Sequence, residues 1–387
     1  MRLFPEKKQA CCRVSRRSDC GSAVRCLGLL GFMLIGLYLS GCSHEPVKIG
    51  FVGTLMGRLS EPSVALRNGV ILAVEEVNRT GGIHGRLVEL LIRDDKRDRS
   101  AAVKIDRELV EKGTVAIIGH DGPFAGEALT YLSRTNTLFV STVPADAGTM
   151  NRSQSYIGLF PPYAEGARLE AGYAFKKLNL RKMAVLYDLS NPVDYPGWLK
   201  HFQESFQSMG GRVTATMEFE SSGSLSMSNL VAKILQSNPD GILLIAGGLD
   251  AALLCQQIRK HAGSLPIMIA PWALTPTFLE CGGPATEGVI GVYCVGDPVR
   301  SGVRHVNRSG FQNRFGEEPG PGTILGYEAA WLVFETILDH PELLKTRNQA
   351  GFLGSSSAGN IAVRFNGLHR AYQLFQVRRG KLERINR

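Results

Sequence analysis

The chain has 387 residues, of which 44% are hydrophobic and 20% are charged. Its length exceeds what one hydrophobic core usually organises, and its apolar content excludes a disordered chain. The formal charge of +9 is concentrated at the N-terminus, because residues 1–41 hold seven basic and two acidic side chains and leave +4 for the rest. No basic stripe with interleaved aromatic residues remains, so the composition argues against nucleic-acid binding.

The chain begins with a targeting segment. An uncharged apolar run of 14 residues at 26–39 follows the basic residues. It is shorter than the roughly 20 residues of a spanning helix and is typical of a secretory signal. The run ends in Leu39-Ser40-Gly41-Cys42, which resembles the lipobox of bacterial lipoproteins. The resemblance predicts cleavage before Cys42 and a lipid on Cys42 that holds the protein on a membrane. An uncleaved anchor and a chance cysteine are the alternatives.

From residue 47 onward, short β-rich runs alternate with amphipathic helical windows. Strands separated by helices imply right-handed crossovers and parallel sheets, so the pattern predicts an α/β chain with two lobes of similar plan. The first series has strands at 47–53, 88–93, 115–118 and 138–141, with helices at 63–78, 101–111 and from near Pro123. After a Gly- and Pro-rich stretch at 156–163, helices are expected at 165–178, 198–209, 227–235, 251–261 and near Thr277, with strands at 183–187, 212–219, 241–245, 266–270 and 289–293 and a strand-like tail at 360–387.

An ordered set of motifs resembles a known family. The set comprises the strand 47–53, Gly69, Glu76-Val-Asn78, Gly81-Gly82-Ile83-His-Gly85, Asp94-Asp95, Val115 to Gly119, and Gly326-Tyr327-Glu328-Ala-Ala330. Together these motifs closely resemble the branched-chain amino acid-binding proteins, which are type I periplasmic binding proteins of ABC uptake systems. The resemblance covers essentially the whole chain after residue 47. It implies two Rossmann-like lobes with parallel sheets, joined by three hinge crossovers, with a ligand in the cleft.

The expected organisation follows from the targeting segment and this resemblance. Residues 1–41 form the lipoprotein signal peptide, and 42–46 form a lipid-anchored linker. The first lobe combines 47–158 with about 293–360, and the second combines 159–292 with about 361–387.

The loops at the carboxyl ends of the strands, where open parallel sheets bind ligands, depart from the family pattern. The resemblance implies hydroxyl side chains that grip a carboxylate, but Pro123 stands at one such place and Pro144-Ala145 at the other. Trp272 replaces an acidic residue that would pair with an α-ammonium group. Asp121 beside the expected helix start also disfavours a carboxylate ligand. We therefore expect free leucine, isoleucine and valine to bind weakly or not at all.

The candidate ligand-binding residues are Asp121, Gly122, Ser141, Thr142, Tyr195 and Trp272. Tyr195, in Asp194-Tyr195-Pro196-Gly197, matches an aromatic turn of the family. With Trp272 it is expected to form a stacking wall at the cleft for an apolar or aromatic ligand, with ring faces that also attract a cation. The alternatives are that Trp272 packs within its lobe and that Asp121 caps a helix.

Other motifs give no support for a cofactor, a metal site or catalysis. Apart from the signal segment and Cys42, the cysteines are Cys255, Cys281 and Cys294, with no CxxC motif and no histidine cluster. A disulfide between Cys281 and Cys294 is compatible with export, but the spacing does not require it. His120 is the sole histidine at a predicted cleft loop, and no Ser/His/Asp arrangement surrounds it. The acidic run that begins at Asp94 is typical of a solvated turn, and no Walker motif is present.

These observations predict a monomeric, lipid-anchored, extracytoplasmic solute-binding protein of a bacterial membrane, on its periplasmic side or at the cell surface. Its partners would be a small-molecule ligand, amino-acid-like or apolar and aromatic, and the permease of an ABC system. The alternative is a ligand-sensing receptor of the same fold that is coupled to a signalling protein. An enzyme is disfavoured, because no cleft loop combines a nucleophile with a base or a metal set.

Overall fold

The computed structural model describes residues 45–57, 59–120, 124–143, 156–190, 194–221, 226–296, 306–344 and 370–385. Apart from Glu45, these residues belong to one compact unit, Pro46–Arg387. Cys42 and the predicted signal peptide lie outside the described residues. Within the described part of the chain, no helix is both long and apolar enough to cross a bilayer.

The first lobe is built on a five-stranded sheet with the order β2-β1-β3-β4-β5, and every neighbouring pair of strands in it is parallel. Its central strands are mostly apolar, as expected of a parallel sheet with both faces covered. Helices α2 and α12 pack over one face, and α3 and α4 pack over the other. The bounds are β1 Val47–Gly53, α2 Glu61–Arg79, β2 Val88–Asp94, α3 Arg99–Glu111, β3 Ala116–Gly119, α4 Ala125–Leu132, β4 Leu138–Ser141, β5 Tyr156–Gly158 and α12 Pro321–Asp339.

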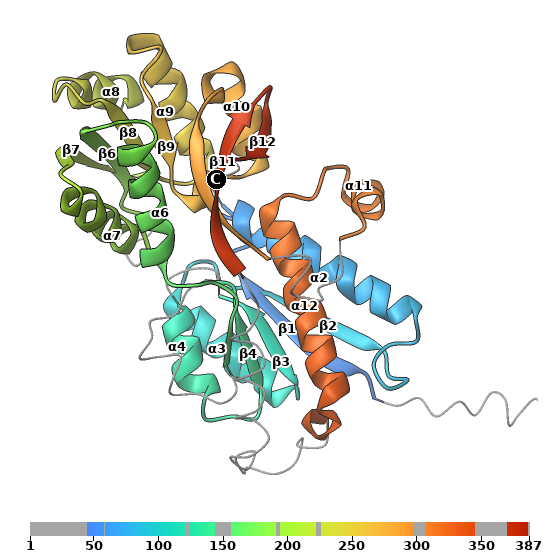
Figure 1. The fold of residues 1–387 in the computed structure, drawn as a ribbon. Coiled ribbons are helices and arrows are strands. Elements are labelled where there is room, and N and C mark those ends of the chain that lie inside the picture. The colour runs from blue at the N-terminus through green and yellow to red at the C-terminus, as the bar shows by residue number, and fades with distance from the viewer. Residues whose placement is uncertain are drawn as a thin grey trace, which may run out of the picture. The chain divides into compact units, whose positions relative to one another are not determined.

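Helices α2 and α12 come from opposite ends of the chain and lie side by side (Figure 1). Two glycines allow this close approach. A Cβ atom on Gly69 would lie 2.0 Å from the carbonyl oxygen of Thr323, and one on Gly326 would lie 2.0 Å from that of Leu66. Both contacts are with backbone, which cannot move aside as a flexible side chain can. The two motif glycines are therefore needed to join the beginning and the end of the first lobe.

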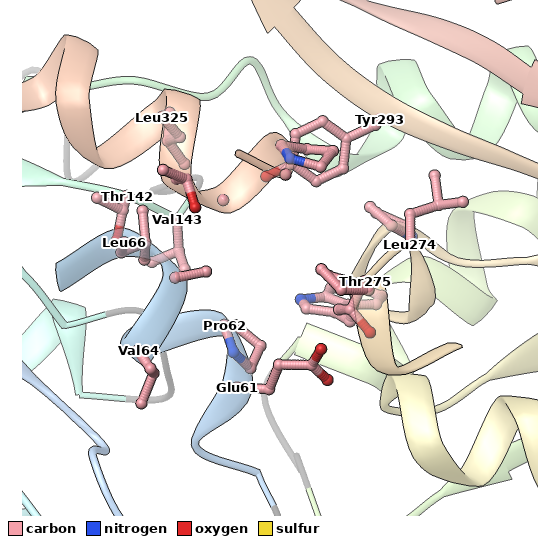
Figure 2. Close-up of a pocket in the computed structure, with 18 of the residues that line it drawn as sticks. Glu61, Pro62, Val64, Leu66, Thr142, Val143, Leu274, Thr275, Tyr293 and Leu325 are labelled. Atoms are coloured by element: carbon pink, nitrogen blue, oxygen red, sulfur yellow. The ribbon is translucent and has the colours of Figure 1, made fainter. Parts of the chain in front are cut away.

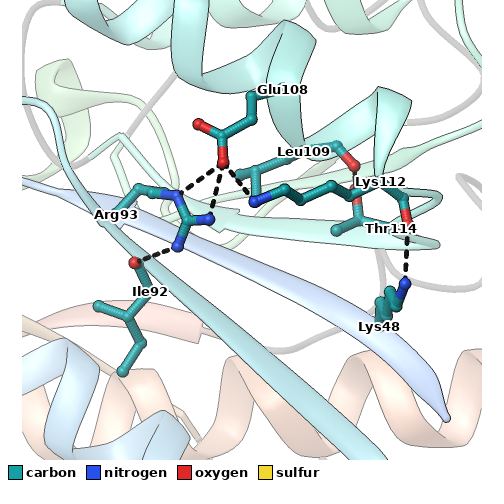
Figure 3. Close-up of polar contacts among 7 residues, drawn as sticks. All are labelled: Lys48, Ile92, Arg93, Glu108, Leu109, Lys112 and Thr114. Atoms are coloured by element: carbon teal, nitrogen blue, oxygen red, sulfur yellow. Dashed lines mark hydrogen bonds and ion pairs between the residues drawn. The ribbon is translucent and has the colours of Figure 1, made fainter.

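A polar network at the edge of the first sheet fixes α3 against β2 (Figure 3). Oε1 of Glu108 accepts hydrogen bonds from Arg93 Nη2 at 2.7 Å and from Lys112 Nζ at 2.6 Å. These hydrogen bonds lower the pKa of Glu108 to about 2. Because Glu108 is 42% exposed, solvent screens the network, and it contributes little to stability.

The second lobe is built on a seven-stranded sheet with the order β12-β11-β10-β9-β8-β6-β7. The strands from β6 to β10 run parallel, whereas β11 pairs antiparallel with β10 and β12 pairs antiparallel with β11. Helices α6 and α7 cover one face, and α8, α9 and α10 cover the other. The bounds are α6 Tyr163–Lys176, β6 Lys182–Asp188, α7 Asp194–Ser208, β7 Arg212–Phe219, α8 Met227–Leu235, β8 Gly241–Ile245, α9 Gly248–His261, β9 Ile267–Ile269, η1 Pro271–Ala273, α10 Pro276–Gly282, η2 Gly283–Thr286, β10 Ile290–Gly296, β11 Arg370–Arg378 and β12 Lys381–Arg384.

The element order shows that the chain passes between the lobes three times. It leaves the first sheet after β5 and returns after β10 to the short helix α11 (Arg308–Phe315), to α12 and to η3 (Pro341–Leu344). It then ends in the second sheet with β11 and β12. β10 continues in that sheet to Gly296, a few residues beyond the approximate boundary expected near 293.

The structure confirms the predicted α/β class with two largely parallel sheets and differs from the local predictions at two places. A short strand, β5, for which no prediction was made, lies in the Gly- and Pro-rich stretch at 156–163, and its Tyr156 is buried against Phe139. Helix α7 begins at Asp194 rather than at 198, because Pro196 is tolerated in the first turn of a helix. The predicted strand-like tail is confirmed over 370–384, where two strands pair antiparallel, and residues 360–369 lie outside the described part.

Candidate functional site

A pocket of about 150 Å³ lies between the two lobes (Figure 2). The first lobe contributes the start of α2, the residues that follow β4, and the loop and first turns of α12. The second lobe contributes η1, the start of α10, and side chains of β10 and β11. The carboxyl ends of β4 and β9 both open into this pocket, as the rule for open parallel sheets predicts.

Proline residues shape the walls of the pocket. Pro62, Pro276 and Pro321 each lie in the first turn of a helix that begins there, namely α2, α10 and α12. Proline is suited to the first turn, because its fixed φ is helical and the N–H that it lacks has no partner within the helix. The start of each of these helices is therefore rigid, and the pocket wall is preformed.

Three described contacts join the two lobes. Glu61, the first residue of α2, accepts a hydrogen bond through Oε1 from the backbone N–H of Thr277 in α10 at 2.9 Å. Arg97 donates to the carbonyl oxygen of Ser190 at 2.6 Å. Arg370 at the start of β11 forms a buried ion pair with Glu328 of α12. All three contacts depend on the two lobes being close together.

Trp272 lines the pocket, but Tyr195 does not. Tyr195 is only 3% exposed and lies directly against Trp272, with the ring centroids 4.8 Å apart. Rings at this separation leave no room for a ligand between them, so of the expected stacking wall only Trp272 faces the pocket. Tyr163 and Trp198 also contact Trp272, at centroid distances of 5.4 and 5.6 Å. The indole is therefore held in place by contacts with three other rings.

Ser141 and Thr142 lie side by side at the end of β4 and differ in what their hydroxyl groups contact. Oγ of Ser141, which is fully buried, donates to the carbonyl oxygen of Val143 at 2.9 Å, so it is used within its own turn. Thr142 lines the pocket and is 4% exposed, and its Oγ1 has no hydrogen-bond partner among the described residues. Of the two candidates, Thr142 is the one available to a ligand.

The candidate residues Asp121 and Gly122 lie outside the described residues, as do Pro123, Pro144 and Ala145. Their neighbour His120 is fully buried, with a left-handed φ of 53°, and its Nε2 lies 2.9 Å from Oδ1 of Asp106. This buried pair fixes the end of β3 to α3. It gives His120 a structural role in the described part of the chain.

The acidic turn after β2 is not simply solvated, as its sequence suggested. Asp95 is 2% exposed and accepts a hydrogen bond from Thr54 Oγ1 at 2.8 Å. Asp94 accepts from the backbone N–H of Leu55 at 3.0 Å. Both carboxylates therefore hold the loop after β1 against the loop after β2. The loop after β1 leads into α2 at the pocket.

Burial changes the acidity of two groups close to the site. Tyr293 lines the pocket, and desolvation raises the pKa of its hydroxyl group. Glu170 of α6 is completely buried, and desolvation raises its pKa to about 8, opposed by a hydrogen bond from Trp198 Nε1 at 2.8 Å. Trp198 in turn contacts Trp272, so this buried carboxyl group lies behind the aromatic wall of the pocket.

In the part of the chain that the structure describes, no group of three or more His, Cys, Asp or Glu residues is arranged to hold a metal ion. Cys255, Cys281 and Cys294 are free thiols, so the structure does not contain the disulfide considered for Cys281 and Cys294. Cys294 is buried in β10, whereas Cys281 is exposed in α10. Burial raises the pKa of Cys255 and of Cys294 to about 12, which makes both thiols unreactive.

Several pocket residues escaped the sequence analysis because they do not follow a strand. They are the first residues of α2, the loop before α12, and the side chains of β10 and β11, exemplified by Glu61, Glu317, Tyr293 and Tyr372. The one local signal was a proline in the first turn of α2, α10 and α12. That signal marks where a helix begins but gives no information about what its first residue faces.

The sequence is similar to a known protein family and to several of its members. Residues 46–352 match the model of a family described as periplasmic binding protein. Over 314 residues, 75% of this chain and 76% of the relative, the sequence is 24% identical to Leu/Ile/Val-binding protein homolog 7 of Brucella abortus. A shorter stretch of 76 residues, 20% of either chain, is 30% identical to the leucine-, isoleucine-, valine-, threonine- and alanine-binding protein of Pseudomonas aeruginosa.

The fold is also similar to that of solved structures. The branched-chain amino acid transporter substrate-binding protein LivJ of Streptococcus pneumoniae, solved in complex with isoleucine, superposes with a TM-score of 0.70. The superposition covers 87% of this chain and 98% of that one, at 19% identity. At this identity the similarity establishes the shared fold and leaves the ligand to be argued from the site.

Proposed function

This chain belongs to the periplasmic binding protein family, and on that premise we propose that it captures a small molecule outside the cytoplasmic membrane and delivers it to the permease of an ABC transporter. The observation that carries the proposal is the pocket between the lobes. Both sheets direct the carboxyl end of a strand into it, and side chains from both lobes line it. A ligand in this position contacts both lobes at once.

Hinge closure is the mechanism that this arrangement supports. Three chain crossings join the lobes, and the contact between Glu61 and Thr277 forms when α2 and α10 are close. A ligand that touches both walls has more contacts in the closed state than in the open state. Binding therefore shifts the population toward closure, which a membrane partner can recognise.

The proposal places the protein on a membrane through a lipid on Cys42, as the Leu39-Ser40-Gly41-Cys42 motif indicates. Several acyl chains give stable attachment, because membrane affinity grows by about 0.8 kcal/mol per buried methylene group. We propose further that the protein acts as a monomer and without catalysis.

The names of the relatives make branched-chain amino acids the first ligands to examine. The described lining gives little support for them. An α-carboxylate is held by cationic side chains, free backbone N–H groups or hydroxyl groups, and the described lining offers the hydroxyl group of Thr142 but no arginine, lysine or histidine. The proposed capture function therefore does not depend on an amino acid as the ligand.

The test is a ligand screen by thermal unfolding of the mature chain, residues 42–387, with Cys42 replaced by Ser to keep it free of lipid. A ligand at a hundred times its Kd stabilises the folded state by about 2.7 kcal/mol, or roughly 5 °C for a chain of this size. Small-angle scattering should then show a smaller radius of gyration with the ligand than without it. Stabilisation without any change in scattering would contradict the closure mechanism. A broad library of amino acids, amides, aromatic acids and amines that gives no shift would contradict capture itself.

A further inference from the structure

The charged side chains of the pocket are the first clue to its ligand. Within the described lining they are Glu61, Glu317 and Glu318, and none of them is basic. Glu61 is half-buried and directs its carboxylate from α2 toward Thr275 (Figure 2). Its Oε1 accepts from Thr277, whereas its Oε2 accepts no hydrogen bond from the described residues. Glu317 and Glu318 lie exposed at the rim, where Arg308 approaches Glu318 only to 3.9 Å.

The second clue is the number of aromatic rings in so small a space. Phe160, Tyr163, Trp272, Tyr293 and Tyr372 all line the pocket of about 150 Å³. The face of an aromatic ring carries a partial negative charge and attracts a cation within about 6 Å of its centroid. The rings and the carboxylates around this cavity therefore both favour a positively charged ligand.

The helix N-termini at the pocket would favour an anion, whereas the rings and carboxylates favour a cation. The N-terminus of a helix attracts anions through its free N–H groups and its dipole. At α10, however, the N–H of Thr277 already donates to Glu61, and that of Phe278 donates to Thr275 Oγ1 at 3.3 Å. A proline in the first turn of α2, α10 and α12 removes a further donor from each helix. An anion would therefore find few free donors among the described residues and would meet three carboxylates.

Thr142 supplies an independent indication that a polar group enters the pocket. Its Oγ1 is buried in the lining and has no hydrogen-bond partner among the described residues. An unsatisfied buried hydroxyl group destabilises the folded state, and a ligand that hydrogen-bonds to it removes this cost. The ligand should therefore carry a hydrogen-bonding group at the end that meets Thr142.

From these four observations, and resting on the capture function proposed above, we propose that the ligand is a small organic cation without a carboxylate. An ammonium centre lies among the aromatic rings, with Glu61 on one side and the Glu317-Glu318 rim on the other. A hydroxyl or amine group of the ligand reaches Thr142. Burial of the rings and of the aliphatic part of the ligand supplies the apolar contribution.

Three probes of the same shape and different charge test the proposal on the mature chain with Cys42→Ser. They are choline, the neutral alcohol dimethylbutanol, in which carbon replaces the quaternary nitrogen, and the anion dimethylbutanoate, in which a carboxylate replaces the hydroxymethyl group of that alcohol. Titration calorimetry at low and at physiological salt gives the three Kd values. Choline should bind at least about tenfold more tightly than the neutral alcohol, the anion should bind most weakly, and added salt should reduce the preference for the cation.

Substitutions of the pocket glutamates then test whether they cause the preference for choline over dimethylbutanol. Glu61→Gln keeps an oxygen that can accept from Thr277 and removes the charge, so it should weaken choline by about two- to fivefold and leave dimethylbutanol unchanged. Neutralising Glu317 and Glu318 as well should raise this loss to about tenfold. Glu75→Gln is the matched control, because Glu75 lies on the same helix, pairs with Arg314 and does not line the pocket.

The outcomes separate this inference from the proposed function. Equal affinity for choline and dimethylbutanol, or tighter binding of the anion, would overturn the assignment of a cation while leaving solute capture in place. A loss of choline affinity in Glu75→Gln as large as that in Glu61→Gln would also overturn it. If choline and a set of other small amines fail to bind at millimolar concentration, the cation assignment is wrong, and the broad screen described above decides separately whether capture stands.

Discussion

Glu170 offers a sharp test of how burial governs the stability of the second lobe. Its side chain is completely buried, Oε2 accepts from Trp198 Nε1 at 2.8 Å, and the causes of its raised pKa include no neighbouring charge. Glu170→Gln preserves the shape of the side chain and an oxygen acceptor for Trp198. The substitution therefore removes the titration of this group and little else.

The size and sign of the effect follow from the pKa. The ordinary value of 4.5 is raised in the fold to about 8. Between these two values the folded chain holds a proton that the unfolded chain has lost, so stability falls as pH rises. At about 1.4 kcal/mol per unit, the loss approaches 5 kcal/mol once the pH exceeds the folded pKa. Below about pH 4.5 both states are protonated, and the loss disappears.

The assay is the melting temperature of the wild type and of Glu170→Gln between pH 4.5 and 9. The two proteins should melt together at the acid end. The variant should gain progressively with pH and reach about 10 °C above the wild type near pH 8, since 1 kcal/mol corresponds to roughly 2 °C in a chain of this size. Glu165→Gln, on an exposed position of the same helix, is the control and should track the wild type. Parallel curves for Glu170→Gln and the wild type would refute the reasoning, because the carboxyl group would then be ionised without cost.

Further expectations concern lipid attachment, helix packing and the ligand. Cys42→Ser should abolish lipid labelling and the signal-peptidase shift in mobility; normal labelling of the variant would disprove the lipobox assignment. Gly326→Ala should destabilise the fold by about 3 kcal/mol because its Cβ would lie 2.0 Å from backbone, whereas Gly172→Ala, with open space around it, should be neutral or slightly stabilising in the same thermal melts. Trp272→Ala should weaken a bound ligand by about 5- to 150-fold, while Tyr195→Ala should mainly lower the melting temperature; unchanged affinity in Trp272→Ala would assign that ring to lobe packing alone. Calorimetry with free leucine, isoleucine and valine should show weak or no binding, and a micromolar Kd for any of them would show that the departures from the family pattern do not change specificity.

Most of the architecture was predictable because burial leaves a periodic trace in the local sequence. The strand at 47–53 and the helix that contains Gly69 were recognised from short windows, and the ordered motifs pointed to the family that the comparisons show. Strand β5 was missed because three residues are too few to carry a period. The antiparallel direction of β11 has no local signature at all, because it depends on where the chain returns to the second sheet.

The sequence by itself therefore determined the α/β class and the near-complete order of elements, both of which are properties of contiguous segments. Tertiary structure decided which side chains meet. Glu61 and the N–H of Thr277 are 216 positions apart in the chain and form one hydrogen bond across the pocket. Tyr195 and Trp272, expected to present a common wall, lie against each other so that only one faces the pocket. The physical reason is that hydrophobic periodicity records whether a residue is buried, whereas a binding site depends on what it is buried against, and that is determined only when distant segments pack.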